Sequence, residues 1–201
     1  MPTLITHAVA AAAIGTMTLP KDVGSRAWSL GIACAMLPDL DVAGFAVGIR
    51  YSDILGHRGL SHSLPFALAL GLVVTALAFR EAQWDSARLR IGLFLCLAAA
   101  SHGLLDAFTN GGLGIAFFAP FSAERYFFPF QPIEVSPIGA AFFSERGLEV
   151  LKSELTWILA PAAMIATLGL ACRGRLPSRR LGKITRSGAR SGSSASEASS
   201  K

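Results

Sequence analysis

Residues 91–108 read IGLFLCLAAASHGLLDAF, an apolar run of helical length that ends with a histidine and an aspartate. His102 and Asp106 are four residues apart, so on a helix their side chains lie on one face. Both could then bind one metal ion, or Asp106 could orient a single His102 ligand through a hydrogen bond. Because ionisable groups are costly in an apolar environment, either interpretation predicts a buried polar site near the end of this helix.

The rest of the chain is also strongly apolar. Of its 201 residues, 52% are hydrophobic and only 15% are charged, and the mean hydropathy is +0.51. A helix needs about 20 apolar residues to cross a bilayer. Five stretches approach that length: 3–19, 27–49, 63–79, 91–108 and 155–172. We therefore predict an all-α fold, a polytopic membrane bundle of four or five transmembrane helices. The first stretch lacks the charged start of a signal peptide, so we expect it to be retained.

The sequence changes character near residue 172. We predict a membrane-embedded domain over 1–172 and a disordered tail over 173–201, which is basic at first and then rich in Ser, Gly and Ala. A basic segment directly after a membrane helix is typical of a cytoplasmic anchor. The tail could also recruit a cytoplasmic partner, whereas we expect no nucleic-acid partner. The isolated cysteines Cys34, Cys96 and Cys172 predict no disulfide framework.

The distribution of Lys and Arg predicts an orientation. If the tail is cytoplasmic and five helices alternate in direction, 13 of the 18 Lys and Arg residues lie on the cytoplasmic side. That multi-pass topology in the inner membrane places every histidine, and the aspartates of the apolar stretches, toward the opposite face. Scattered polar residues would not gather in this way, so we expect one site that opens away from the cytoplasm.

The stretch LPDLD, residues 37–41, places two carboxylates inside an apolar segment. Pro38 disturbs a helix at this position because it lacks a backbone donor. Asp39 and Asp41 are two residues apart, so a regular helix would point them to nearly opposite sides. Either the helix is broken here, or one aspartate is a metal ligand while the other caps a helix or holds a histidine. We favour Asp41 as the ligand and Asp39 as a catalytic base.

The stretch GHRGLSHSLP, residues 56–65, adds two histidines, His57 and His62. They do not share a helical face, but Gly56 and Gly59 allow a turn from which both could converge. The planar guanidinium of Arg58 suits phosphate or carboxylate oxygens, which predicts a catalytic and substrate-binding role. The alternative is a polar interfacial loop with incidental histidines. Ser61 or Ser63 could cap the helix that follows.

His7 is a lone histidine on an Ala-rich helix, where a satisfied core residue is the plainer interpretation. Its predicted depth, level with the other polar groups, makes it a further candidate ligand. We thus predict six metal ligands: His7, Asp41, His57, His62, His102 and Asp106. Histidine and aspartate without a thiolate suit one or two divalent ions, zinc or manganese.

The segment 109–146 is too rich in Gly, Pro and Phe for a plain linker. Asn110 begins a tight-turn signal, Asn-Gly-Gly. The many aromatic residues predict an interfacial loop that acts as a lid or as a groove for acyl chains. Asn110 and Arg125 are candidates for substrate binding, although Glu124 and Arg125 could equally be an interfacial salt bridge. Residues 144–154 predict a short amphipathic helix.

His7, PDLD, HRGLSHS and HGLLDAFTNGG, in this order, resemble the YdjM family of inner-membrane proteins, and PFSAERYFFP (residues 120–129) resembles a loop of that family. The resemblance covers nearly the whole chain up to about residue 172. It implies a metal-dependent hydrolase. The order of the motifs is more distantly similar to the zinc-dependent phospholipase C and single-strand nuclease superfamily, which implies hydrolysis of phosphoesters.

These observations predict a membrane-embedded, metal-dependent hydrolase. A site at the membrane–water boundary suits a membrane lipid or a lipid-linked phosphoester, and a bound divalent ion would activate water and polarise the substrate oxygen. The main alternative is a transporter of metal ions or protons that uses the same His and Asp residues as a relay. A third interpretation is an assembly protein whose basic tail recruits a cytoplasmic partner.

Overall fold

The computed structural model describes residues 1–80, 85–137 and 142–175. The helices of these residues are, in chain order, α1 (Leu4–Thr18), α2 (Ser25–Met36), the 3-10 helices η1 (Leu37–Val47) and η2 (Leu60–His62), α3 (Leu64–Ala78), α4 (Ser86–Ala107), α5 (Glu145–Glu154), the π-helical turn η4 (Leu155–Leu159) and α6 (Ala160–Arg175). Between residues 108 and 137 the backbone forms only isolated bridges, Thr109 with Ile133 and Ile115 with Tyr126. The predicted all-helical fold is confirmed. The predicted tail lies outside the described residues from position 176 onward.

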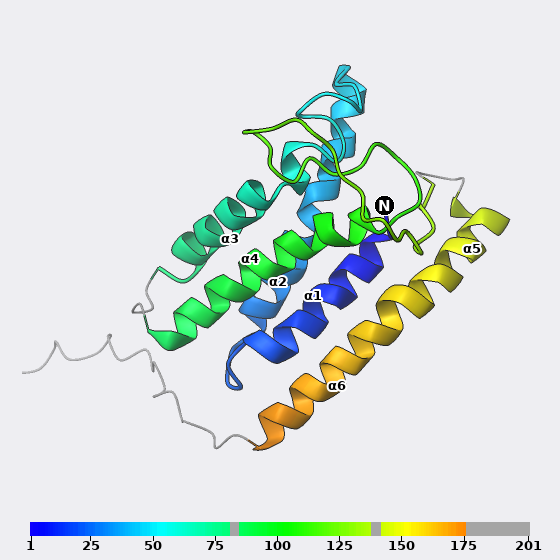
Figure 1. Ribbon diagram of the computed structural model, residues 1–201. Helices are drawn as coiled ribbons and strands as arrows, with labels where there is room; N and C mark the ends of the chain where they lie inside the picture. The colour runs from blue at the N-terminus through cyan, green and yellow to red at the C-terminus, as the bar shows by residue number, and fades with distance from the viewer. Residues whose placement is uncertain (81–84, 138–141, 176–201) are drawn as a thin grey trace, which may run out of the picture.

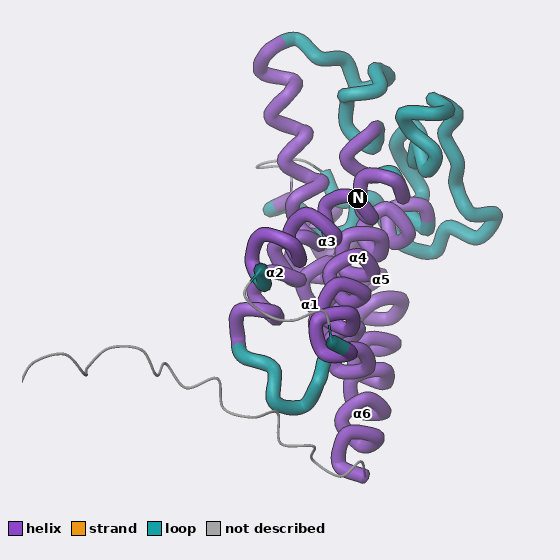
Figure 2. The backbone as a smooth tube through the Cα atoms, turned by 90° about the vertical axis from the view of Figure 1, so that its left-hand side faces the viewer, coloured by secondary structure: helices purple, strands orange, loops and turns teal. Residues whose placement is uncertain are grey.

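The long helices run side by side, and the direction of the chain alternates through α1, α2, α3, α4 and α6 (Figure 1). The 3-10 helix η1 continues α2, and α5 continues through η4 into α6. Helix α4 packs against α1, α2 and α3, while α1 also contacts α6. Most of the loop residues gather at one end of the bundle, seen in teal in Figure 2. We call this the loop end. It holds the start of α1, the end of η1, the start of α3, the end of α4 and the start of α5.

Three of the described helical segments are long and apolar enough to cross a membrane: Ser25–Val47, Ser86–Ala107 and Glu145–Arg173. Helices α1 and α3 are apolar but have 15 residues each, which is about 22 Å against a hydrocarbon core of about 30 Å. The outer face of α3 exposes Leu68, Leu72, Val73 and Leu77, as a lipid-facing helix would. The described part of the chain therefore carries three candidate membrane-spanning helices, while the count of four or five and the interfacial position of the aromatic loop stay predictions.

Local sequence explains where several helices begin and change. The Ser63 hydroxyl accepts a hydrogen bond from the Phe66 amide and caps α3, and Asp85 caps α4 through the Arg88 amide. Pro38 stands at the start of η1, where the α-helical backbone of α2 gives way to a 3-10 helix. The predicted disturbance in LPDLD is therefore confirmed. The amphipathic helix predicted at 144–154 is α5.

Small residues allow the helices to pack closely around one aromatic ring. Phe94 of α4 is fully buried and lies against Gly15 of α1 and Gly31 of α2. A Cβ atom at Gly31 would overlap the Phe94 ring. Helices in a membrane associate through such close contacts, because lipid provides no hydrophobic driving force between them. This packing fixes α2 against α4 and so positions the site residues that both helices carry.

We expect Gly31→Val to lower the free energy of unfolding by about 1–3 kcal/mol, because the added atoms collide with Phe94. Thermal unfolding of the detergent-purified protein measures the change. Gly24→Ala is the matched control, since no atom lies within 4 Å of a Cβ at Gly24. Adding Phe94→Leu should restore part of the loss. An unchanged melting temperature for Gly31→Val would show that the ring can move aside.

Candidate metal centre

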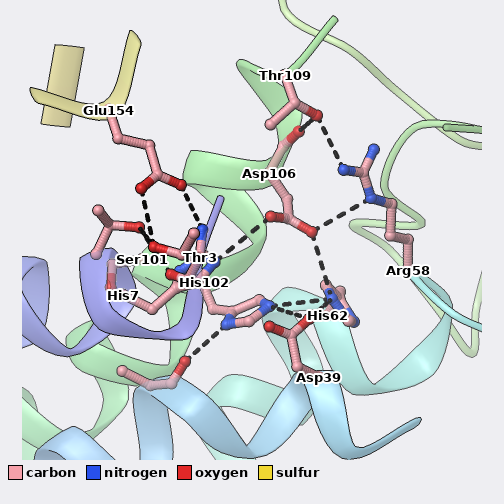
Figure 3. A network of polar contacts seen from close by, with 12 residues as sticks. Thr3, His7, Asp39, Arg58, His62, Ser101, His102, Asp106, Thr109 and Glu154 are labelled. Atoms are coloured by element: carbon pink, nitrogen blue, oxygen red, sulfur yellow. Dashed lines mark hydrogen bonds and ion pairs between the residues drawn. The ribbon is translucent and has the colours of Figure 1, made fainter. Parts of the chain in front are cut away.

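The structure brings the predicted histidines and aspartates together at the loop end. Figure 3 shows five of them, His7, Asp39, His62, His102 and Asp106. They come from four helices and one loop: His7 from α1, Asp39 and Asp41 from η1, His57 from the loop before η2, His62 from η2, and His102 and Asp106 from α4. All four imidazoles are buried, as are Asp39 and Asp106, and the Asp41 side chain is only 7% exposed. Elements far apart in the sequence thus build one polar cluster inside an apolar protein.

Four of these residues can offer one ligand atom each to a common point. The ligand atoms of Asp39, His62, His102 and Asp106 all lie within 4.8 Å of one another. We call this set the four-residue cluster. His102 Nε2 lies 3.3 Å from Asp39 Oδ1 and 3.1 Å from His62 Nε2. His62 Nε2 lies 3.5 Å from Asp106 Oδ2. Two imidazoles and two carboxylates form a donor set that suits a divalent ion such as zinc.

The carboxylates of this cluster lack ordinary hydrogen bonds. Both oxygens of Asp39 and both oxygens of Asp106 are fully buried and accept no hydrogen bond from the described residues. A buried charge is very costly unless it is paired or coordinates a metal. Arg58 Nε, 3.3 Å from Asp106 Oδ2, offsets part of this charge, and a bound cation would balance the rest and satisfy the oxygens directly.

The backbone fixes the orientation of His102. Its Nδ1 lies 2.6 Å from the carbonyl oxygen of Ala35, and a carbonyl can only accept. Nδ1 therefore carries the proton, and Nε2 presents its lone pair to the four-residue cluster, as in most histidine ligands of metals. Gly103 lies under the His62 carbonyl, and a Cβ there would come within 2.5 Å of that oxygen. The glycine lets η2 rest on α4 and brings His62 to His102.

His7 borders the cluster without joining it. Its ring stacks on His102, with ring centroids 3.8 Å apart, and its Nε2 lies 3.6 Å from Asp106 Oδ1. Neither ring nitrogen of His7 has a hydrogen-bond partner among the described residues. Its role as a ligand stays a prediction.

A second group consists of Asp41, His57 and His62. Asp41 Oδ1 lies 2.7 Å from His57 Nδ1, and Asp41 Oδ2 lies 3.2 Å from His62 Nδ1. Asp39, which we predicted as a base, lies in the four-residue cluster, and Asp41, which we favoured as a ligand, lies in this second group. The two roles stay predictions.

The carboxylates also act on the protonation of His62. Burial by itself lowers the pKa of this imidazole, but its contacts with Asp106, Asp39 and Asp41 outweigh burial and raise the pKa to about 10. The ring is therefore in its positively charged form, with a proton on each nitrogen, when no cation is bound. A divalent ion at Nε2 would replace that proton and balance the same negative charges.

Arg58 is fully buried and contacts Asp106, with its Nε 3.3 Å from Asp106 Oδ2. Its Nη2 donates to Thr109 Oγ1 at 2.9 Å, and its Nη1 donates to the Gly111 carbonyl at 2.6 Å. The backbone of Arg58 has a φ of 64°, a left-handed conformation that is uncommon for a residue with a side chain. The guanidinium thus joins the site to the start of the loop that follows α4. The predicted binding of a substrate anion by Arg58 stays a prediction.

The other two predicted substrate-binding residues contact loop segments. The Arg125 guanidinium donates to the carbonyls of Tyr51, Asp53, His57 and Gly114, at 3.0–3.4 Å. Asn110 donates to Glu134 at 2.8 Å and accepts from the Val135 amide at 3.0 Å. Glu124 accepts a hydrogen bond from the Tyr126 hydroxyl. These contacts hold the loops together, and substrate binding by Asn110 and Arg125 stays a prediction.

Glu154 is a buried residue that sequence reasoning did not select. Its carboxylate accepts hydrogen bonds from the Thr3 amide and, at 2.8 Å, from the Thr3 hydroxyl. It thereby ties the start of α1, the helix of His7, to the end of α5 (Figure 3). In the sequence, the one sign that Glu154 is buried is its position directly before the apolar stretch 155–172.

A helical bundle with candidate membrane-spanning segments and a buried His/Asp cluster at one end is typical of a membrane protein with a candidate metal site. The chain belongs to the YdjM inner membrane protein family, whose sequence profile matches residues 1–176. It is also similar to the inner membrane protein YbcI of Escherichia coli (strain K12), with 40% identity over 167 residues, 82% of this chain and 95% of that protein. No solved structure matches the chain. The family resemblance drawn from the motifs is thus confirmed.

Proposed function

We propose that this chain is a membrane-embedded, metal-dependent hydrolase that acts on a phosphoester or lipid-like substrate at the extracytoplasmic membrane face. One observation carries the proposal: two histidines and two aspartates converge in a buried cluster whose carboxylate oxygens lack hydrogen-bond partners. One divalent ion, zinc or manganese, would be held by Asp39, His62, His102 and Asp106. The orientation toward the extracytoplasmic side rests on the distribution of Lys and Arg.

When bound, a divalent ion supplies Lewis-acid polarisation of a substrate oxygen and lowers the pKa of a bound water. The protein's own groups prepare the site for it. Arg58 offsets part of the negative charge of Asp106, and the Ala35 carbonyl keeps Nε2 of His102 free of a proton. A guanidinium beside a divalent ion is an arrangement that stabilises phosphoryl transfer, which favours a phosphoester.

The surroundings of the cluster favour an amphiphilic substrate. The side of the site formed by Asp41 and Ser61 is only partly buried, whereas His7, His102 and Asp106 are fully buried. Water and substrate would therefore enter between η1 and η2. Leu40, next to Asp41, is 70% exposed, and Leu64, three residues after Ser61, is 39% exposed. An apolar rim around a polar centre suits a lipid or a lipid-linked phosphoester at the membrane boundary.

The transporter alternative requires a polar path through the bundle. Among the described residues, the buried histidines, aspartates and glutamate all belong to elements at the loop end. Beyond them the core consists mainly of apolar side chains, including Cys34, Phe94, Leu95 and Ala98. Thr16, Thr75 and Arg88 are the buried polar side chains in that part of the described bundle. This core favours a site that binds and reacts over one that conducts.

The detergent-purified full chain tests the proposal. We expect about one divalent ion per chain by elemental analysis. We also expect hydrolysis of bis(p-nitrophenyl) phosphate, or of phosphatidylglycerol in vesicles, that a chelator stops and added zinc or manganese restores. Proteoliposomes should show no flux of metal ions or protons. Bound metal together with ion flux and no hydrolysis would instead support a transporter.

A further inference from the structure

The two aspartates of LPDLD differ in their hydrogen bonding. Both carboxylate oxygens of Asp39 are buried without a hydrogen-bond partner. Asp41 has partners at both oxygens: His57 Nδ1 lies 2.7 Å from Oδ1, while Ser61 Oγ donates to Oδ2 at 2.6 Å and the Arg58 amide donates to Oδ2 at 3.3 Å. Because a metal ligand needs a free lone pair facing the ion, the unpartnered oxygens of Asp39 fit a cation better than those of Asp41, which already have partners.

His62 lies between the two aspartates and presents a different nitrogen to each. Its Nε2 faces the four-residue cluster, 3.7 Å from Asp39 Oδ1 and 3.5 Å from Asp106 Oδ2. Its Nδ1 lies 3.2 Å from Asp41 Oδ2 and 3.0 Å from Ser61 Oγ, the hydroxyl that itself donates to Asp41 Oδ2. When a carboxylate accepts the Nδ1 proton of a neutral histidine, the lone pair is on Nε2, where a metal ion can bind, and the plane of the ring is fixed.

We propose that Asp41 is a positioning residue: it holds His62 with Nε2 toward the bound cation, and it holds His57 outside the ligand set. The inference rests on the cation site of the proposed function. His57 directs Nδ1 at Asp41, and its ring stands 5.2 Å from that of His62 in an edge-on arrangement. The single carboxylate of Asp41 therefore fixes two imidazoles at once.

The chemistry of an amide makes Asp41→Asn a sharp probe. Asparagine keeps the size of the side chain, but its NH₂ group can only donate. One of the two imidazoles would then face a donor with its own N–H and would have to turn or change tautomer. An orienting carboxylate is typically worth about 10–100-fold in metal affinity. Loss of a metal ligand, by contrast, should abolish binding of one metal ion per chain.

The test measures Co²⁺ and Zn²⁺ affinity by competition with a chelator, together with the visible absorption of the Co²⁺-loaded full chain in detergent. We expect Asp41→Asn to bind one ion about 10–100-fold more weakly with an unchanged Co²⁺ absorption band, because the ligands stay the same. Asp39→Asn should lose stoichiometric metal. Asp53→Asn removes an exposed aspartate whose side chain pairs with Arg50, and it should bind as the wild type does.

Two results would overturn the inference: loss of stoichiometric metal in Asp41→Asn, which would make Asp41 a ligand, or an affinity equal to that of the wild type. If Asp41→Asn fails to fold, Ser61→Ala decides, because it removes the hydroxyl that donates to Asp41 Oδ2 and also contacts His62 Nδ1. This loss should weaken binding by about 2- to 10-fold. Ser61→Ala with wild-type affinity would then count against the inference. These measurements need no hydrolysis, so a protein that binds metal without hydrolysing a substrate would contradict only the proposed function. A wild-type chain that binds no divalent ion would contradict both.

Discussion

Asp106→Asn and His102→Ala are each expected to abolish stoichiometric metal binding and to lower hydrolysis by more than about 100-fold, beyond the range typical of residues that only orient a ligand. Asp106 contacts three side chains of the site: Oδ1 faces His7 at 3.6 Å, while Oδ2 faces Arg58 at 3.3 Å and His62 at 3.5 Å. Replacing this carboxylate by an amide removes a negative charge from the point where the proposed cation is bound.

Elemental analysis and initial rates on the same preparations measure this effect. Ser101→Ala is the matched control, because Ser101 precedes His102 on α4 and its hydroxyl donates only to the Ala98 carbonyl among the described residues. All three variants should insert in the membrane and elute as the wild type does. Full metal content in both Asp106→Asn and His102→Ala would remove these residues from the ligand set.

The parts of the site that follow local rules could be predicted from sequence. The four-residue spacing of His102 and Asp106 places them on one face of any helix, and α4 is a regular helix there. The Lys and Arg distribution placed the polar residues of separate stretches at one end, and the structure brings them together. Periodicity and chain direction suffice for such features.

The choice between Asp39 and Asp41 required coordinates. Two residues apart, they cannot both face one point on a regular helix, and the sequence shows that conflict clearly. Its solution depends on η1, whose 3-10 backbone directs Asp39 toward His102 and Asp41 toward His57. The partners lie 63 and 16 residues away in the sequence, as the residue numbers show. No local pattern encodes which partner each carboxylate meets.

The arginines show a different limit of sequence reasoning. A buried guanidinium near histidines suggests an anion site, and that chemistry is sound. In the structure, however, Arg125 donates to four backbone carbonyls and Arg58 donates to a carbonyl and a threonine. Every residue has a carbonyl, so the sequence carries no signal for such contacts. They appear only when the loops around residues 51–57 and 109–114 are placed together.

Arg58→Met is expected to lower the free energy of unfolding by about 3–5 kcal/mol, the range found when one partner of a buried ion pair is removed. Both Arg58 and Asp106 are fully buried, so the remaining carboxylate would have no solvent to stabilise it. Methionine fills most of the space of the arginine side chain. Because it is also an unbranched residue with a Cβ atom, the positive φ at this position should cost about the same for both residues. Added zinc should restore part of the loss, because the cation supplies positive charge beside the same carboxylate.

A double-mutant cycle in thermal unfolding experiments distinguishes two causes of that loss: the unpaired Asp106 carboxylate and the lost hydrogen bonds of Arg58. If the unpaired carboxylate is the cause, Arg58→Met should cost clearly less in the Asp106→Asn background than in the wild type. Arg50→Met, eight residues earlier, is the control: Arg50 is 82% exposed and pairs with Asp53 at the surface, so its loss should leave the melting temperature unchanged. An equal cost of Arg58→Met in both backgrounds would assign the stabilisation to the hydrogen bonds with Thr109 and Gly111, since these are the contacts that Asp106→Asn leaves in place.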